Sequence, residues 1–156
     1  MKTDVMLISS VGGHLTQLTQ LFPLMDEYRT CLITERIPLT EDLQTKYQHV
    51  DYLVYGTRNY LFTYLFKFSF NILKSFYLFF KYQPKVVITT GTHTAVPMCY
   101  IAHLFKRKVI FIESFAKKDS ANLSGKMVYP IADVFMVQWE SMLQVYPKAV
   151  YKGGIY

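Results

Sequence analysis

Glycine-rich nucleotide motifs and metal-ligand patterns are absent from this sequence. It contains neither G-x-G-x-x-G nor G-x-x-x-x-G-K-[ST], so dinucleotide binding and P-loop chemistry are poorly supported. It also has no G-x-S-x-G nucleophile elbow. The four histidines and two cysteines have no metal-ligand spacing, and we therefore expect neither a metal ion nor a cofactor.

Cysteine is scarce, and the two cysteines stand far apart in the chain. Cys31 and Cys99 form no C-x-x-C pair, so we predict reduced, half-buried thiols of a cytosolic protein rather than a disulfide. The start of the chain lacks the apolar stretch and small-residue cleavage site of a signal peptide. We therefore expect the chain to fold in the cytoplasm.

Acidic residues are also few, because 11 of them stand against 17 lysines and arginines, a formal net charge of +6. Such an excess suits nucleic acid, an anionic membrane surface or a phosphorylated substrate, and charge alone does not choose among them. Apolar residues make up 51% of the 156 residues, which excludes a disordered chain. The length predicts a single domain over residues 1–156.

Short apolar runs alternate with segments of helical spacing along the chain. Strands are predicted at residues 5–8, 30–34, 51–55, 86–89, 109–112 and 134–137, and helices at 14–25, 40–48, 94–105 and 123–132. This alternation predicts a Rossmann-like α/β domain, with a mostly parallel sheet and helices on both faces. Right-handed crossovers bring the carboxyl ends of its strands to one edge, where ligands bind in such sheets.

Residues 59–82 hold 11 of the 26 aromatic residues in the chain. A strand of this length would be too long, so we predict a helix of about 36 Å. Lys67, Lys74 and Lys81 recur every seven residues and share one narrow stripe of that helix. Because the segment has no uncharged run of about 18 residues, a membrane span is disfavoured.

Aromatic residues beside a lysine stripe favour a helix that lies in the bilayer interface, near anionic lipid head groups. A core helix with extended lysines and a partner interface are the alternatives. The predicted membrane contacts are Tyr60, Phe62, Phe66, Lys67, Phe70, Lys74, Phe79 and Lys81.

A glycine pair follows the first predicted strand, in the run SVGGH at residues 10–14. Gly12 and Gly13 allow a tight turn that presents backbone N–H groups at a helix start, where a phosphate or diphosphate binds. His14 suits a general base near neutral pH or a hydrogen-bond donor to a bound phosphate. A helix-start histidine without chemistry fits the spacing equally well.

Two further strand ends carry polar groups. Residues 89–93 (TTGTH) offer hydroxyls around a glycine turn, which suits oxygen-rich ligands or an ordinary turn into a helix. Glu113 ends the fifth predicted strand, where a carboxylate binds a sugar hydroxyl, accepts a proton or serves only as a capping acid. The lysines that follow are phosphate contacts or surface charges.

Residues 111–140 read FIESFAKKDSANLSGKMVYPIADVFMVQWE, a long and specific run. Together with residues 10–14, this run resembles the asparagine-linked glycosylation fourteen family, and the resemblance extends over nearly the whole chain. More distantly, the layout is similar to the N-terminal domain of the peptidoglycan lipid-intermediate N-acetylglucosaminyltransferase. That enzyme also has a Gly-Gly-His loop and a glutamate at the position of Glu113.

The resemblance implies the N-terminal half of a GT-B inverting glycosyltransferase, whose bacterial relatives serve capsular and exopolysaccharide synthesis. This half would bind the cytoplasmic face of the cell membrane and a lipid-linked saccharide acceptor. The nucleotide-sugar donor would bind a separate subunit that resembles asparagine-linked glycosylation thirteen. The chain stops at Tyr156, about where the interdomain connection would begin, and we expect no nucleic-acid partner.

The implied site has His14 as the first choice for a proton acceptor and Glu113 as the second. Lys117 stands where the family usually has arginine, and lysine loses bidentate phosphate recognition. Ile112 replaces the histidine that precedes the glutamate in the peptidoglycan enzyme. Eukaryotic members have an N-terminal membrane helix, so residues 59–82 would have to anchor this chain. The acceptor- or phosphate-binding residues implied are Ser10, Gly12, Gly13, Gly91, Thr92, His93, Ser114 and Lys117.

Two other functions fit the same residues. A non-catalytic scaffold would recruit and activate a complete transferase at the membrane, and it would tolerate substitution of His14 and Glu113. A stand-alone nucleotide-binding domain would bind a nucleotide sugar without a partner.

Overall fold

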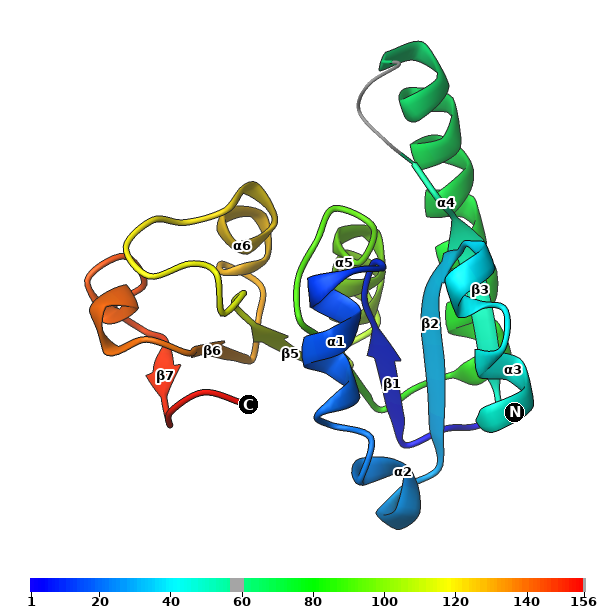
Figure 1. Ribbon diagram of the computed structural model, residues 1–156, viewed down its shortest axis with the longest axis horizontal. Coiled ribbons are helices and arrows are strands. Elements are labelled where there is room, and N and C mark those ends of the chain that lie inside the picture. The colour runs from blue at the N-terminus through cyan, green and yellow to red at the C-terminus, as the bar shows by residue number, and fades with distance from the viewer. Residues whose placement is uncertain (57–60, 156) are drawn as a thin grey trace.

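The computed structural model describes residues 1–56 and 61–155. Its centre is a seven-stranded sheet in the order β3-β2-β1-β4-β5-β6-β7, and every strand pairing is parallel (Figure 1). The Rossmann-like class predicted from the sequence is confirmed. The strands are β1 (Val5–Ile8), β2 (Thr30–Arg36), β3 (Val50–Val54), β4 (Val86–Thr89), β5 (Lys108–Ile112), β6 (Val134–Val137) and β7 (Val150–Tyr151).

The helices connect successive strands, and the main differences from the predictions are in two helical segments and one strand. The helix predicted at residues 14–25 is interrupted before Pro23, which lacks a backbone N–H for a continuous helix. The predicted polar helix at 40–48 is a short 3-10 turn followed by a single helical turn, and β7 was not predicted. The helices are α1 (Gly13–Thr19), α2 (Leu24–Glu27), α3 (Leu43–Lys46), α4 (Leu61–Tyr82), α5 (Val96–Leu104) and α6 (Leu123–Val128), with 3-10 turns η1 (Pro38–Thr40) and η2 (Glu140–Leu143).

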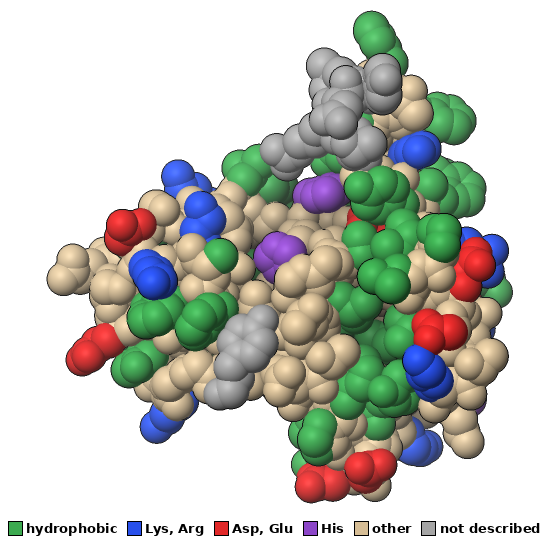
Figure 2. Space-filling model, viewed as in Figure 1, with side chains coloured by type: hydrophobic (Ala, Val, Ile, Leu, Met, Phe, Trp, Pro, Cys, Tyr) green, Lys and Arg blue, Asp and Glu red, His purple; other side chains and the backbone are tan. Residues whose placement is uncertain are grey.

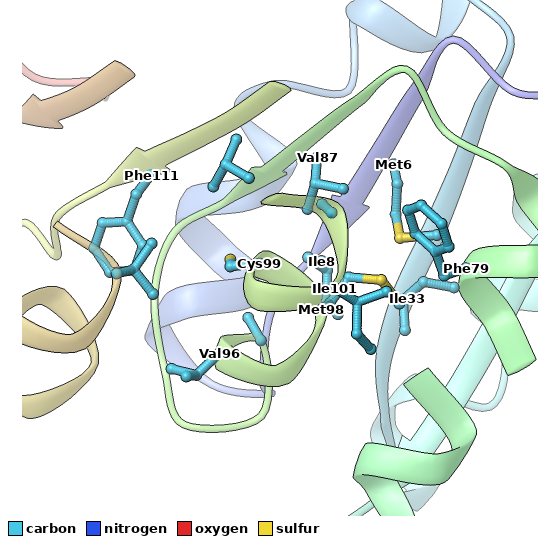
Figure 3. Close-up of a cluster of buried hydrophobic side chains, with 14 of the residues drawn as sticks. Met6, Ile8, Ile33, Phe79, Val87, Val96, Met98, Cys99, Ile101 and Phe111 are labelled. Atoms are coloured by element: carbon cyan, nitrogen blue, oxygen red, sulfur yellow. The ribbon is translucent and has the colours of Figure 1, made fainter. Parts of the chain in front are cut away.

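The sheet is covered on both faces, and each face has its own apolar core. One core packs α4, α5 and α6 against side chains such as Met6 and Phe111 (Figure 3). The other packs α1, α2 and α3 against side chains such as Leu7 and Leu32. Alternating strand residues supply the two cores, because successive side chains point to opposite faces of a sheet.

Both cysteines are free and belong to the core beneath α4 and α5. The prediction of half-buried thiols was wrong, because Cys31 and Cys99 are both 0% exposed. Burial raises the pKa of each thiol to about 12, which leaves almost no reactive thiolate at neutral pH.

Asn71 fixes α4 to the edge of the sheet. Its Oδ1 accepts a hydrogen bond from the backbone N–H of Val54, and its Nδ2 donates to the carbonyl of the same residue, both over 2.8 Å. This amide replaces the strand that β3 lacks at the sheet edge. These two hydrogen bonds therefore set the direction in which the first half of α4 leaves the body of the domain (Figure 1).

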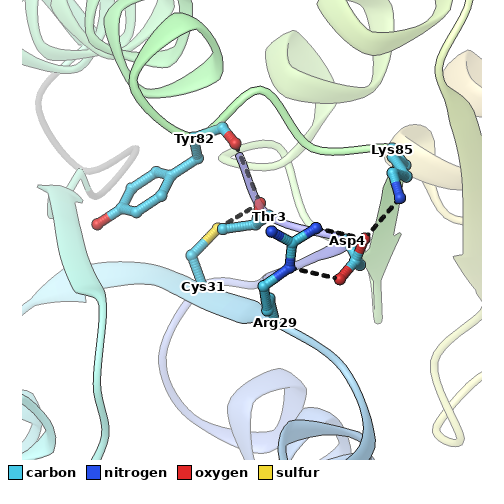
Figure 4. Close-up of polar contacts among 6 residues, drawn as sticks. All are labelled: Thr3, Asp4, Arg29, Cys31, Tyr82 and Lys85. Carbon is cyan, nitrogen blue, oxygen red and sulfur yellow. Dashed lines mark hydrogen bonds and ion pairs between the residues drawn. The ribbon is translucent and has the colours of Figure 1, made fainter. Parts of the chain in front are cut away.

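A cluster of charges joins the starts of three strands, at the end of the sheet where the strands begin. Asp4, just before β1, accepts hydrogen bonds from Arg29 at 3.0 and 3.2 Å and pairs with Lys85 at 2.8 Å (Figure 4). These cations hold the pKa of the Asp4 carboxyl well below its usual range. The cluster is exposed, so it positions the strand starts more than it stabilises them.

Candidate functional site

The candidate site lies at the switch point of the sheet, where the strand order reverses between β1 and β4. The chain leaving β1 enters α1 on one face, and the chain leaving β4 enters α5 on the other (Figure 1). In open parallel sheets, the two loops at such a point diverge and form a crevice for a ligand. Residues 9–12 and 90–95 form these loops and carry most of the predicted phosphate-binding residues.

His14, in the first turn of α1, is joined to the loop after β4 by two hydrogen bonds. Its Nδ1 lies 2.8 Å from the carbonyl oxygen of Thr90, and the Thr90 hydroxyl donates to the carbonyl oxygen of His14 over 2.7 Å. Because a carbonyl only accepts, Nδ1 carries the proton of this hydrogen bond. In the neutral imidazole, Nε2 is therefore the nitrogen with the lone pair, as a general base requires.

The glycine pair leaves open space beside His14. Gly12 has φ of +78°, a conformation that favours glycine, and a Cβ at Gly12 or Gly13 would meet no atom within 4 Å. Within the described residues, the backbone N–H groups of Gly13 and His14 have no acceptor. Ser10 is buried and donates its hydroxyl to the carbonyl of Val11 over 3.3 Å, so this predicted ligand bonds within its own loop.

The loop after β4 has an unusual backbone. Gly91 has φ of +101° and Thr92 has φ of +91°, although β-branched residues rarely adopt positive φ. The Thr92 hydroxyl is buried and has no hydrogen-bond partner among the described residues. Strained backbone and unpaired buried polar groups concentrate at functional sites, so both features mark this loop as part of the site.

His93 points toward the aromatic helix. Its ring lies 5.4 Å from the ring of Tyr64 and 6.4 Å from the ring of Phe68, both on α4. The loop at the switch point thus contacts α1 through Thr90 and α4 through His93.

Glu35, which the sequence analysis missed, ties the two switch-point loops together. It is 2% exposed at the carboxyl end of β2, accepts the Thr94 hydroxyl over 2.6 Å and accepts the Val11 N–H over 3.4 Å. Burial raises the pKa of its carboxyl above the usual value. The signal was present, because a charged residue that continues an apolar strand must find buried partners.

Glu113 is completely buried at the end of β5. Its Oε1 accepts hydrogen bonds from the Ser114 N–H and the Asn122 side chain, and its Oε2 accepts one from the Tyr146 hydroxyl over 3.0 Å. Burial raises the pKa of this carboxyl as well. All of the Glu113 surface is covered by protein, and its role as a proton acceptor stays a prediction.

Gln17 and Gln138, which were also not predicted from the sequence, connect Glu113 and the loop after β5 to α1. The Gln17 Oε1 accepts hydrogen bonds from the Phe115 N–H at 3.0 Å and from the Gln138 side chain at 2.7 Å. The Gln138 amide also donates to the carbonyl of Glu113 over 2.9 Å. Because Gln17 lies one turn after His14, the loop after β5 is held against the same helix.

Ser114 and Lys117 begin that loop. Ser114 is buried and accepts the N–H of Ala116 at its hydroxyl, whereas Lys117 is half-buried and its charge opposes the rise in the pKa of Glu113.

Across residues 1–56 and 61–155, His, Cys, Asp and Glu side chains form no group of three that could hold a metal ion.

The outer face of α4 is an exposed apolar surface, and hydrophobic side chains gather over this helix in Figure 2. Each of its large residues is at least 49% exposed, and Phe62 reaches 90%. None of the helices that the structure describes has the length and apolar character that a membrane span needs. The outer face comprises Phe62, Leu65, Phe66, Phe70, Leu73, Tyr77 and Phe80.

Two predicted membrane contacts lie elsewhere, and a third falls outside the described residues. Phe79 is 3% exposed and packs in the core on the opposite side of α4, because the helical period turns it away from the outer face. Lys81 pairs with Asp51 over 2.6 Å, so its charge is already matched within the protein. Tyr60 lies outside the residues that the structure describes.

Lys67 and Lys74 instead border a surface hollow of about 500 Å³ beside β3. Arg36, at the end of β2, lines the same hollow and stacks over the Tyr52 ring at 5.2 Å. Neither lysine has an ion-pair partner among the described residues. Three cations therefore stand along one flank of the outer face of α4.

Comparison with known proteins decides the family. The model of the family described as "Oligosaccharide biosynthesis protein Alg14 like" matches residues 56–155. This chain belongs to the Alg14-like family. The UDP-N-acetylglucosamine transferase subunit ALG14 of Candida albicans is 42% identical over 79 residues, which are 47% of this chain and 36% of that protein. The human subunit of the same name is 34% identical over 87 residues, which are 52% of this chain and 40% of that protein.

The matched segments thus span less than half the length of these Alg14 relatives. Solved structures share the fold at low sequence identity. MurG of Acinetobacter baumannii has a TM-score of 0.68 at 14% identity, covering 88% of this chain and 41% of that one. UDP-N-acetylglucosamine 2-epimerase of Rickettsia bellii has a TM-score of 0.72 at 15% identity, covering 99% and 45%. These matches support the GT-B-like, Rossmann-like architecture.

Proposed function

We propose that this Alg14-like chain is the acceptor-binding, membrane-recruiting subunit of a two-component glycosyltransferase. The enzyme would transfer a sugar from a nucleotide-sugar donor to a lipid-linked saccharide in polysaccharide biosynthesis. The observation that carries the proposal is the pairing of His14 with Thr90 beside the open Gly12–Gly13 turn at the switch point. The family assignment adds weight, because its relatives are named subunits of a UDP-N-acetylglucosamine transferase.

His14 is the group we assign to the chemical step. A hydroxyl of the acceptor attacks the anomeric carbon of the donor sugar, the bond from sugar to phosphate breaks, and the nucleotide leaves. Nε2 of His14 takes the proton of that hydroxyl, since Nδ1 is occupied by Thr90. The N–H groups of Gly13 and His14 would bind the acceptor diphosphate, with Gly91, Thr92 and His93 closing the other side.

Glu113 has a positioning role in this proposal. Its three hydrogen bonds hold the start of the loop that carries Ser114 and Lys117, and Lys117 is the cation we assign to the acceptor phosphates. A partner subunit, resembling asparagine-linked glycosylation thirteen, would bring the nucleotide sugar to the facing side of the cleft.

A non-catalytic scaffold is the second candidate, and the burial of the edge carboxylates favours it. Glu35 and Glu113 are 2% and 0% exposed, so neither acid reaches a substrate directly. Catalysis by this chain would then depend on His14 alone, whereas a scaffold would need no proton acceptor.

The test is reconstitution with the donor-binding subunit. The two chains would be purified together and assayed with UDP-N-acetylglucosamine and a lipid-linked saccharide, and each chain would be assayed alone. We expect transfer by the pair and little transfer by either chain. Strong turnover by this chain without a partner would overturn the two-component proposal.

We place the chain at the cytoplasmic face of the membrane, with the outer face of α4 in the bilayer interface and Lys67 and Lys74 near lipid phosphates. Replacing Phe62 and Phe66 together by serine should lower binding to anionic liposomes about a hundredfold, since the two exposed phenyl rings together contribute on the order of 3 kcal/mol when buried. Flotation of the full chain with liposomes measures the loss.

Matched controls distinguish membrane binding by the outer face of α4 from non-specific binding by any exposed apolar side chain. Leu39→Ser removes an apolar side chain that is 82% exposed on η1, away from α4, and should leave flotation unchanged. Lys67→Glu with Lys74→Glu should weaken binding to anionic vesicles but not to neutral ones, and exposed Lys152→Glu should have little effect. Equal losses from Leu39→Ser and the phenylalanine pair would contradict the assignment.

A further inference from the structure

A groove runs between α4 and α5 on the face of the sheet that these helices cover. It encloses about 450 Å³, which is within the size range of pockets for small organic ligands. Both helices start at the carboxyl edge of the sheet, so the groove runs from that edge toward the opposite one. Its lining is Phe68, Ile72 and Phe76 on α4, Val96, Pro97, Tyr100, Ile101, His103 and Leu104 on α5, and Met127 on α6.

The lining is almost entirely hydrocarbon. The Tyr100 hydroxyl is already used, because it donates to the carbonyl of Met127 over 2.9 Å. Apart from Tyr100, His103 near the end of α5 is the one residue in this lining with a polar side chain. An occupant with many polar groups would lose its hydrogen bonds to water here, so the groove selects a ligand that is itself apolar.

The upper end of the groove meets the candidate site. Phe68 lines the groove, and its ring lies 6.4 Å from the ring of His93. His93 belongs to the same short loop as Thr90, which holds the imidazole of His14. A ligand that left the groove at this end would therefore reach the loop after β4, which is hydrogen-bonded to His14.

The side of the groove is continuous with the outer face of α4. Ile72 lines the groove while its neighbour Leu73 is 69% exposed on the outer face. At the lower end, Leu104 is 70% exposed, and Phe105 packs against the exposed Phe80 of α4 at 5.2 Å between ring centroids. The groove thus opens along the surface that we assign to the bilayer interface.

We propose that this groove holds the first part of the hydrocarbon chain of the lipid-linked acceptor. The chain enters from the bilayer along α4, lies between α4 and α5, and places its diphosphate at the Gly12–His14 turn. This inference rests on the proposed function, because it takes the acceptor to be lipid-linked. A single extended hydrocarbon fits better than a protein segment, since an extended peptide would bring backbone groups that this lining cannot pair.

Three probes separate the groove from the loop: farnesyl diphosphate, farnesol and inorganic diphosphate, each titrated calorimetrically into the full chain. Ile72→Trp fills the groove, whereas Leu39→Trp places the same side chain on the exposed 3-10 turn η1, away from α4. We expect Ile72→Trp to weaken farnesyl diphosphate and farnesol at least tenfold and to leave inorganic diphosphate unchanged. Leu39→Trp should leave all three affinities unchanged.

A second variant guards against misfolding of Ile72→Trp. Leu104→Glu adds a carboxylate at the exposed lower end and should weaken farnesol and farnesyl diphosphate while thermal unfolding stays unchanged. Farnesyl diphosphate binding that is equal in wild type, Ile72→Trp and Leu104→Glu would overturn the groove assignment. So would the absence of saturable farnesol binding to the wild type, which would point to a protein occupant.

The outcome for the proposed function is read separately. If farnesol binds and is lost in Ile72→Trp, but diphosphate adds no affinity, the groove is supported and the acceptor site at Gly12–His14 is wrong. If inorganic diphosphate binds and the groove variants change nothing, the acceptor site is supported and the groove assignment is wrong.

Discussion

Gly125→Ala is expected to destabilise the fold by about 3–5 kcal/mol, a large part of the 5–15 kcal/mol that a domain of this kind has in total. A Cβ at this position would lie 2.4 Å from Oε2 of Glu113 and 2.5 Å from the hydroxyl oxygen of Tyr146. Both atoms are buried and bonded to each other over 3.0 Å, so neither can move without breaking a buried hydrogen bond. Overpacking costs about 1–3 kcal/mol and a lost hydrogen bond to a charged group about 1.5–3 kcal/mol.

Urea unfolding followed by circular dichroism gives the change in the free energy of unfolding. Gly13→Ala is the matched control, because a Cβ there meets nothing within 4 Å and the residue has no positive φ. We expect that control to stay within about 0.5 kcal/mol of the wild type. Equal midpoints for the two alanine variants would mean that the packing around Glu113 is not as tight as the structure places it.

The sequence predicted the sheet well because buried parallel strands leave a direct signal. Runs such as residues 5–8 and 86–89 are apolar at every position or nearly so, as expected for strands covered on both faces. The short β7 has only two residues, Val150 and Tyr151, and both are exposed, so no apolar run announces it. Very short strands and single helical turns form through contacts with residues far away in the chain, so the local sequence does not predict them.

The candidate site was predicted in part. The turn at Gly12 and the histidine after it could be identified because glycine and strand-end position are local features. The burial of Glu113 could not, since its partners Asn122 and Tyr146 come from two other segments. For Glu35 the charged residue in an apolar strand was a visible signal, but its partner was not, because the Thr94 hydroxyl that satisfies its carboxylate lies 59 positions further on.

The aromatic helix α4 shows what the sequence alone could not predict. Composition indicated an interfacial helix, but composition treats Phe66 and Phe79 alike. The structure exposes the first to 79% and the second to 3%, because α4 must also cover the core over half of its length. Which aromatic residues face outward is decided by the sheet against which the helix packs.

His14→Ala is expected to lower the rate of sugar transfer by the reconstituted pair about 10²–10⁴-fold, the usual contribution of a positioned acid or base. The reason is that Nε2 is the proposed proton acceptor and that both edge carboxylates are buried. Initial rates at saturating donor and acceptor give the change in kcat. A rate within twofold of the wild type would instead favour the scaffold, which needs no proton acceptor.

His14→Asn separates chemistry from positioning. An asparagine side chain keeps a donor near the place of Nδ1, so it can still bond the Thr90 carbonyl, but it has no equivalent of Nε2. We expect this variant to bind inorganic diphosphate and the partner subunit like the wild type and yet to transfer as slowly as His14→Ala. If asparagine restored the rate, the imidazole would serve only to join α1 to the loop after β4. The chemistry would then belong to the partner subunit, and this chain would contribute the acceptor site and the membrane surface alone.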